Sequence, residues 1–211
     1  MPITLARPDG LYLTTKAPLA EVLKDEILGE FADGLLRRAV AGLALEELSH
    51  LSLAETLHQT GSASVDALLT ALLVLDAEVK AVVEKETRVF PLPGFLSYRE
   101  RLPLATFPLS LLRLPPLNPG GHYHFSTLGV HHYLAVRLDL HAQSKAAGHV
   151  RLAVASVFNS PQRIKPVEER LDRHFLTEAH IDRAIAAGAD LLTDLEQIRL
   201  REILRGLINN P

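Results

Sequence analysis

The sequence predicts an α+β fold, and three observations carry this prediction. Apolar residues recur at helical spacing in segments before residue 75 and again after residue 165. Apolar and polar residues alternate over residues 133–140 and again over 150–154, which is the period of strands. Of the 211 residues, 47% are hydrophobic and 22% are charged, so the chain can bury a sizeable core.

The N-terminal segments predict one strand followed by helices. Residues 11–15 form a short β-favouring run, and residues 17–24 have the pattern of a short helix. Residues 27–39 carry an apolar stripe at helical spacing, with Gly42 as a plausible stop. Residues 64–73 carry a second such stripe and predict a helix capped by a serine.

The middle of the chain predicts strands and extended connections. Residues 77–83 and 88–91 have the pattern of strands joined by a turn. Prolines then concentrate in residues 91–120, which excludes a continuous helix. We therefore expect extended connections and short edge strands in this stretch.

The two alternating runs predict an antiparallel hairpin with one buried face. In residues 133–140, four apolar side chains point one way, and the remaining set points the other way and includes Arg137 and Asp139. Residues 150–154 repeat the alternation after a polar turn. One face of this hairpin should therefore lie on a core and the other should face solvent.

The C-terminal third predicts helices. Residues 165–173 form a short charged segment, and Thr177 can cap the helix that follows it. Asp194, with Gln197 three residues on, has the spacing of a capping box and predicts the start of the final amphipathic helix.

Composition excludes several classes of function. The formal net charge is −3, which gives no electrostatic footprint for nucleic acid or anionic membranes. Cysteine is absent, which excludes disulfides, a thiol nucleophile and cysteine-bound metal. The first ten residues lack the features of a signal peptide, and the longest apolar stretch, residues 65–75, is too short to span a bilayer. We therefore expect a cytoplasmic protein without nucleic-acid or membrane partners.

The residues alone name no reaction. No nucleophile, dinucleotide-binding or P-loop motif is present, and the Gly120-Gly121 pair predicts a plain turn rather than a phosphate site. Arg37 and Arg38 could grip a phosphate, although a solvated helix face is the favoured interpretation. Asp66 could hold a ligand hydroxyl, and the alternative is an acid that favours the N-terminal turn of its helix.

The ten histidines are the one compositional oddity. His122 and His124 would share one face of a strand, and His131 and His132 follow shortly. Neutral imidazoles at these positions could bind a metal. Exposed or hydrogen-bonded histidines are the favoured interpretation, because the spacing offers no third ligand of obvious geometry.

Several phrases, in their order along the chain, resemble the FAD-binding (medium) subunit of molybdenum hydroxylases, the family of xanthine dehydrogenase and carbon monoxide dehydrogenase. ALLVLDAEV at residues 71–79 is similar to the family phrase "ALLALdAeV". RVFPLPGFLSYR at residues 88–99 is similar to "RtVPLedFftgYR", and VRLAVASVFNSPQR at residues 150–163 is similar to "vrlAlggvaptPvR". The resemblance spans nearly the whole chain.

This resemblance implies a specific organisation. Residues 1–118 would form the second subdomain of a PCMH/VAO-type FAD-binding fold. Residues 119–211 would form a small antiparallel sheet with helices, like the C-terminal domain of the carbon monoxide dehydrogenase flavoprotein. The family's first subdomain, with its Gly-Gly-Thr pyrophosphate loop, has no counterpart in the chain, so the resemblance implies a truncated relative.

The second glycine signature of the family, "atIGGNl", falls on residues 52–57, where both glycines are replaced. Ser52 lies at the family's threonine, Glu55 brings a negative charge towards the phosphates, and Asp66 lies one residue out of register with the family's aspartate. The expected cofactor-binding residues are therefore Ser52, Glu55 and Asp66, with no catalytic or metal-binding residue and no tight binding of FAD.

Three hypotheses follow from these departures. The favoured one is a non-catalytic subunit or assembly component, with molybdenum and iron–sulfur subunits as partners. The second is a working flavin oxidoreductase subunit whose missing half another chain supplies. The third is a metal- or small-molecule-binding module built on residues 122–132. Because surface left by a missing subdomain should be partly apolar, we also expect a homo- or hetero-oligomer.

Overall fold

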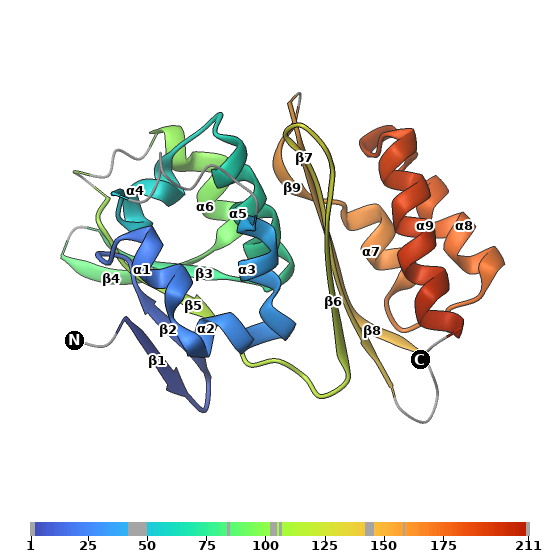
Figure 1. The fold of residues 1–211 in the computed structure, drawn as a ribbon, viewed down its shortest axis with the longest axis horizontal. Coiled ribbons are helices and arrows are strands. Elements are labelled where there is room, and N and C mark those ends of the chain that lie inside the picture. The colour runs from blue at the N-terminus through green and yellow to red at the C-terminus, as the bar shows by residue number, and fades with distance from the viewer. Residues whose placement is uncertain are drawn as a thin grey trace.

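The computed structural model describes residues 3–41, 50–83, 85–101, 105, 107–141, 146–157 and 159–209. Within them the chain forms two antiparallel sheets, one with the strand order β1-β2-β5-β3-β4 and one with the order β6-β7-β8-β9. Figure 1 shows the second sheet between two layers, with helices α7, α8 and α9 on one side and the first sheet with its helices on the other. The mixed helix-and-sheet fold predicted from the sequence is confirmed.

The central strand of the first sheet is β5, the last of its five strands along the chain. Its strands are β1 (Thr4–Arg7), β2 (Gly10–Thr14), β3 (Glu78–Val83), β4 (Glu86–Pro91) and β5 (Leu109–Leu114). β5 pairs with β2 on one side and with β3 on the other. The expectation of edge strands in the proline-rich stretch is therefore wrong for β5, which contains no proline and can donate every hydrogen bond of a central strand.

The helices of the first half cover one side of this sheet. They are α1 (Leu19–Lys24), α2 (Glu26–Glu30), the short η1 (Phe31–Gly34), α3 (Leu35–Val40), α4 (Leu53–His58), α5 (Ala63–Val74), α6 (Leu92–Tyr98) and the short η3 (Arg99–Arg101). α5 is buried on nearly every face, because it lies between the two sheets. α6 falls where only extended chain was expected, and Pro93 is tolerated there because it sits in the first turn.

The helix predicted over residues 27–39 is broken in its middle. Ala32, Asp33 and Gly34 all have left-handed backbone conformations, with φ values of 54°, 54° and 70°. Gly34 takes this conformation freely, whereas each of the other two pays about 1–2 kcal/mol. The chain therefore changes direction between α2 and α3, which the apolar spacing alone does not reveal. The predicted stop, Gly42, lies outside the described residues.

The second sheet and its helices form the second half. The strands are β6 (Gly121–Gly129), β7 (His132–Leu140), β8 (Ala147–Ser156) and β9 (Asn159–Arg163). The helices are α7 (Lys165–Leu171), α8 (Glu178–Ala187), the short η4 (Ala189–Leu191) and α9 (Asp194–Asn209). β7 and β8 pair in antiparallel fashion, so the predicted hairpin is confirmed. The division between residues 118 and 119 falls in the connection from β5 to β6 and stays a prediction.

Both faces of the predicted hairpin are buried, which corrects the expectation of one solvent face. Leu134 and Val136 pack against the C-terminal helices. On the opposite face, Tyr133 is 2% exposed and Arg137 is 1% exposed. The reason is that the first half of the chain covers this second face, a contact that alternation within one strand cannot reveal.

The caps of the last two long helices show one prediction that is confirmed and one that is wrong. The Thr177 hydroxyl accepts a hydrogen bond from the His180 N–H at 3.3 Å and caps α8, as predicted. At α9 the reciprocal pair is Thr193 and Glu196, one residue before the predicted Asp194 and Gln197. Among the helices described, none combines the length and apolar character that crossing a membrane requires.

Candidate functional site

Ser52 and Glu55 form a capping box at the start of α4. The Glu55 carboxylate accepts hydrogen bonds from the Ser52 N–H and hydroxyl, both at 2.7 Å. In return, the Glu55 N–H donates to the Ser52 hydroxyl at 3.2 Å. The two hydrogen bonds from Ser52 lower the pKa of Glu55, which keeps this carboxylate ionised. The structure thus brings together two of the three predicted cofactor residues, with roles in helix capping.

The backbone of this segment has no N–H group left for a phosphate. The Leu53 N–H donates to the Ala17 carbonyl at 3.0 Å, and the Ala54 N–H donates to the Thr15 carbonyl at 2.9 Å. The Thr56 N–H donates to the Ser52 carbonyl at 2.9 Å. A diphosphate is bound by free backbone N–H groups and repelled by carboxylates. The residues present at the second glycine signature therefore do not fit the diphosphate of FAD.

Asp66 is the third predicted cofactor residue, and it lies in the first turn of α5. No hydrogen bond joins it to Ser52 or Glu55, and no described residue donates one to its half-buried carboxylate. Burial raises the pKa of Asp66, against the opposing charges of Arg99 and His131. Of the three residues, Asp66 is thus the one whose side chain makes no hydrogen bond with the described residues.

The histidines of residues 122–132 have different neighbours in the structure. His132 Nε2 lies 2.9 Å from Glu196 Oε1, an oxygen on α9. His122 and His124 share one face of β6, as predicted, and line a hollow of about 430 Å³ against α9. Throughout the described ranges, no three histidine, aspartate or glutamate side chains are grouped so that they could hold a metal ion. The favoured interpretation of hydrogen-bonded or surface histidines fits these positions.

A cluster of charges around Asp76 joins the two halves, and no interpretation of the sequence singled it out. The Asp76 carboxylate accepts hydrogen bonds from Arg151 Nε at 2.7 and 2.8 Å and from Arg163 Nη1 at 3.0 Å. His149 Nε2 lies 2.8 Å from Asp76 Oδ2. Glu168 completes the cluster through two hydrogen bonds from Arg163, at 2.8 and 2.5 Å. The available signal was the phrase ALLVLDAEV, in which Asp76 is the one charge between a buried helix and a buried strand.

This cluster holds Asp76 strongly ionised. Burial by itself would raise the pKa of Asp76, but hydrogen bonds with His149 and Arg151 and the charges of both arginines lower it to about 2. Glu168 also accepts the Leu152 N–H at 2.8 Å, which ties α7 to the backbone of β8. Because Asp76 follows α5 and its partners lie on β8 and β9, the cluster fastens the first half of the chain onto the second sheet.

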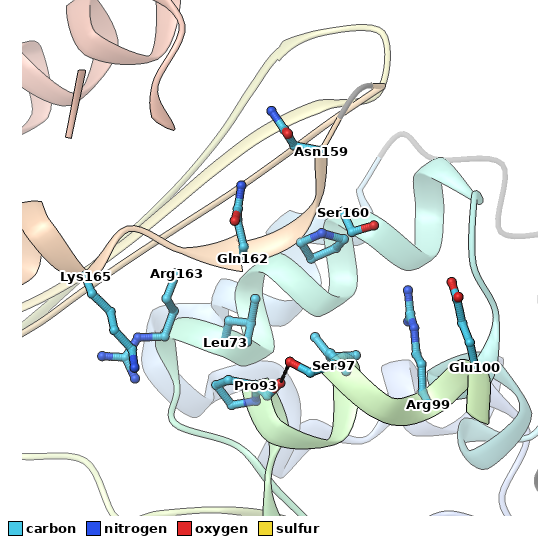
Figure 2. A pocket seen from close by; sticks show the side chains of 12 residues that line it. Leu73, Pro93, Ser97, Arg99, Glu100, Asn159, Ser160, Gln162, Arg163 and Lys165 are labelled. Atoms are coloured by element: carbon cyan, nitrogen blue, oxygen red, sulfur yellow. Dashed lines mark hydrogen bonds between the residues drawn. The ribbon is translucent and has the colours of Figure 1, made fainter. Parts of the chain in front are cut away.

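A groove of about 470 Å³ lies beside this cluster (Figure 2). One wall comes from α6 and η3, the other from β9 and the start of α7, and Leu73 of α5 forms part of the floor. We call it the Arg99 groove; its lining residues are Leu73, Pro93, Leu96, Ser97, Arg99, Glu100, Asn159, Ser160, Pro161, Gln162, Arg163 and Lys165. Sequence reasoning missed it, because its walls are brought together from segments far apart in the chain.

Arg99 is the unusual member of this lining. Its residue is 6% exposed, and its one hydrogen bond within the described structure is a long one, 3.3 Å from Nη1 to the Leu57 carbonyl. Burial lowers the pKa of Arg99, while the charges of Asp66 and Glu100 act in the opposite direction. Neither carboxylate comes within ion-pair distance, so among the described residues the guanidinium has one acceptor, the Leu57 carbonyl, and it lines the edge of the groove.

A second hollow, of about 390 Å³, lies on the outer face of the first sheet. Its apolar part is formed by Ile3, Leu5 and Leu111, and its rim carries cationic side chains. Arg7 and Lys80 lie over the ring of Tyr12, at 5.2 and 5.1 Å from its centroid. This face of the sheet is therefore partly apolar and basic.

The fold matches solved structures of carbon monoxide dehydrogenase and of quinoline 2-oxidoreductase at low sequence identity. A chain of the carbon monoxide dehydrogenase from Hydrogenophaga pseudoflava, in the form that lacks the Mo-pyranopterin moiety, aligns with a TM-score of 0.72 and 13% identity, over 98% of this chain and 76% of that one. A chain of quinoline 2-oxidoreductase from Pseudomonas putida 86 aligns with a TM-score of 0.71 and 13% identity, over 97% of this chain and 75% of that one.

A chain of the reconstituted carbon monoxide dehydrogenase from Oligotropha carboxidovorans gives a TM-score of 0.66 at 10% identity, over 97% of this chain and 74% of that one. The sequence matches no protein-family model, and comparison with curated proteins yields no match. The resemblance inferred from the order of local phrases is thus confirmed at the level of fold, across almost the whole chain.

Proposed function

We propose that this protein is a divergent relative of the flavoprotein subunit of molybdenum hydroxylases and acts as a non-catalytic subunit or assembly partner without tightly bound FAD. The observation that carries this proposal is the closed segment from Ser52 to Thr56. Its backbone N–H groups are used within the chain, and the Glu55 carboxylate lies where phosphate would have to approach. Repulsion and unmet hydrogen bonds at such a site act against binding of a diphosphate.

The shared fold supports the family part of the proposal. Residues 1–118 would correspond to the second subdomain of the PCMH/VAO-type FAD-binding fold. Residues 119–211 would correspond to the C-terminal domain of the flavoprotein. Each half keeps an antiparallel sheet with helices, and the two halves remain joined by the Asp76 cluster.

Partners of this protein would be the molybdenum and iron–sulfur subunits of a hydroxylase, or a second copy of the chain. The support is the outer face of the first sheet, where apolar side chains lie beside Arg7, Lys16 and Lys80. Partly apolar surface of this kind is commonly covered by another protein.

A working FAD-binding oxidoreductase subunit is the second candidate, with the missing half of the site supplied by another chain. One observation favours it: the half-buried Asp66 carboxylate accepts no hydrogen bond from the described residues and could accept one from a flavin hydroxyl. Electrons from molybdenum and iron–sulfur partners would then pass through the flavin to an acceptor.

Absorbance spectroscopy of the purified protein, from the near ultraviolet to the visible, decides between the two candidates. We expect no flavin bands, either as purified or after incubation with excess FAD and gel filtration. The double variant Ala54→Gly/Glu55→Gly should take up more FAD than the wild type, because it removes the carboxylate and frees the Ser52 N–H. Ser52→Ala is the matched control, since it breaks the capping box but leaves Ala54 and Glu55 in place.

Stoichiometric flavin in the wild-type protein would overturn the proposal. The same measurement after co-expression with molybdenum and iron–sulfur subunits tests the second candidate. Flavin found only in the assembled complex would favour that candidate. A complex without flavin, in which the chain still co-purifies with those subunits, would support a non-catalytic role.

A further inference from the structure

We propose that the Arg99 groove binds a small organic anion, whose carboxylate or phosphate group pairs with Arg99 while its apolar body lies along the groove floor. The groove contains none of Ser52, Glu55 and Asp66. The inference therefore goes beyond the proposed function and does not depend on whether the protein binds FAD.

The first argument is the state of the Arg99 guanidinium. A buried arginine ordinarily satisfies its five N–H donors with carboxylates or carbonyls. Arg99 is more than nine-tenths buried, yet the described residues accept one hydrogen bond from it, at the carbonyl of Leu57. Arg99 lines the groove, so an anion placed there could accept hydrogen bonds from the donors that have no acceptor among the described residues.

The second argument is the charge along the groove. Arg163 is already neutralised by Asp76 and Glu168. Lys165 has no ion pair with any described residue, and it lies at the end of the groove opposite to Arg99. Two cations without an ion pair among the described residues, Arg99 and Lys165, thus line the groove with one carboxylate, that of Glu100, while Asp66 acts on Arg99 from outside the lining. The formal net charge of the chain is −3. The groove is a local basic site in an acidic protein, which favours anions over neutral or cationic molecules.

The third argument is the chemistry of the walls between these two ends. Ser160 and Gln162 lie on β9 and line the groove, and their side chains make no hydrogen bond with described residues. Leu73, Leu96 and Pro161 provide apolar surface between the polar groups. A volume of about 470 Å³ lies within the range of about 300–1,000 Å³ that is usual for small-molecule sites. An apolar body with an anionic head fits these walls better than a bare inorganic ion.

Methyl NMR spectroscopy of the full chain with defined probes tests the proposal on the wild-type protein. The probes are benzoate, phenyl phosphate, their uncharged counterpart benzamide, and inorganic phosphate. We expect benzoate or phenyl phosphate to shift the methyl signals of Leu73 and Leu96 in a saturable manner, and benzamide to leave them in place. The tighter of the two anions identifies the head group as carboxylate or phosphate.

Three outcomes would overturn the proposal: no probe shifts these signals, benzamide shifts them as strongly as benzoate, or inorganic phosphate binds as tightly as phenyl phosphate. The last result would indicate an adventitious ion only. None of these outcomes bears on flavin absorbance, so failure here is distinguishable from failure of the proposed function.

Variants then assign the anion to Arg99. Arg99→Gln removes the positive charge and leaves a polar side chain that is two atoms shorter, and it should weaken binding about tenfold or more, the effect of losing a charge-assisted hydrogen bond. Lys165→Gln, at an exposed position, should weaken binding about threefold and should not disturb folding. Arg173→Gln is the control, because this side chain is 91% exposed and lies outside the groove. Unchanged affinity in Lys165→Gln and in folded Arg99→Gln would contradict the assignment.

Discussion

Two polar clusters lie between the first half of the chain and the second sheet, and they differ in how completely their groups are paired. Around Asp76, two carboxylates, two arginines and a histidine are joined by hydrogen bonds of 2.5 to 3.0 Å. Around Arg137, three buried atoms have no hydrogen-bond partner among the described residues: Tyr123 Oη, Arg137 Nε and Asp139 Oδ1. The other Asp139 oxygen accepts a hydrogen bond from Asn118 Nδ2 at 2.7 Å. Arg137 is the cross-strand neighbour of Arg151, so both clusters share one face of the sheet.

Burial of charged groups therefore has opposite consequences for stability in the Asp76 cluster and in the Arg137 cluster. The Asp76 cluster replaces water with protein partners and so holds the halves together. In the Arg137 cluster, the nearest approach of opposite charges is 3.6 Å, from Arg137 Nε to Asp139 Oδ1, and the guanidinium lies 5.9 Å from the Tyr123 ring centroid. Buried groups without partners contribute a desolvation cost and little compensating stability.

Gly121 makes the second cluster sterically possible. A Cβ atom at this position would lie 2.4 Å from the Tyr123 hydroxyl and 3.0 Å from Asp139 Oδ1. Those side chains therefore occupy the space that any other residue would need. The only double glycine of the chain, which the sequence predicts to be a plain turn, thus also accommodates a buried tyrosine.

The largest effect is expected from a substitution that breaks the Asp76 cluster. Asp76→Asn should lower the free energy of unfolding by about 2–3 kcal/mol, because Arg151 and Arg163 would remain partly buried without their shared anion. Urea denaturation monitored by circular dichroism measures this loss. Glu86→Gln is the control: its ion pair with Arg88 is exposed and 3.4 Å long, so the change should stay within about 0.5 kcal/mol. Equal losses in the two variants would show that the Asp76 cluster does not hold the halves together.

Low pH should weaken the same cluster, because it protonates Asp76. The pKa of Asp76 is about 2 in the folded protein against an ordinary value of 3.8. Its contribution is therefore present above pH 4 and is lost as the pH falls from about 4 to 2, for a total of about 2 kcal/mol. Urea denaturation across this range should show the loss in the wild type and a correspondingly smaller one in Asp76→Asn. Parallel pH profiles for the two proteins would contradict the assignment.

The smallest effect on stability is expected in the Arg137 cluster. Tyr123→Phe should change the free energy of unfolding by less than about 0.5 kcal/mol, because the buried hydroxyl that it removes has no partner among the described residues. The control is Thr15→Val, which removes a fully buried hydroxyl that donates to the Leu109 carbonyl at 2.8 Å. That variant should lose about 1 kcal/mol. A larger loss of unfolding free energy in Tyr123→Phe than in Thr15→Val would contradict the proposed difference between hydrogen-bonded and unbonded buried groups.

Much of the fold was predictable from local patterns. The strand at residues 77–83, the β7–β8 hairpin and the Thr177 cap are confirmed, because each depends on residues close together in sequence. The α2–α3 break was not predictable, since Ala32 and Asp33 adopt left-handed conformations that their side chains do not favour. The central place of β5 was equally hidden, because strand order depends on pairing between distant segments.

The candidate site likewise combines features that the sequence predicted with features that only the structure revealed. Replacement of both glycines at residues 52–57 was visible in the sequence, and it predicted that the segment would not suit a diphosphate. The reason emerged only in the structure, where the Ser52–Glu55 capping box and the carbonyls of Ala17 and Thr15 take the backbone N–H groups. The Arg99 groove carried no local signal, because its two walls are about sixty residues apart in the chain.

The sequence by itself determined the mixed fold, the absence of cysteine chemistry and the altered glycine signature, because composition and short-range periodicity encode each of them. The tertiary structure alone decided that both faces of the hairpin are buried, that Asp76 joins the two halves, and that the buried Arg99 borders a groove. These features arise from packing between segments far apart in the chain. The burial and pairing of a charge depend on that packing and not on its neighbours in sequence.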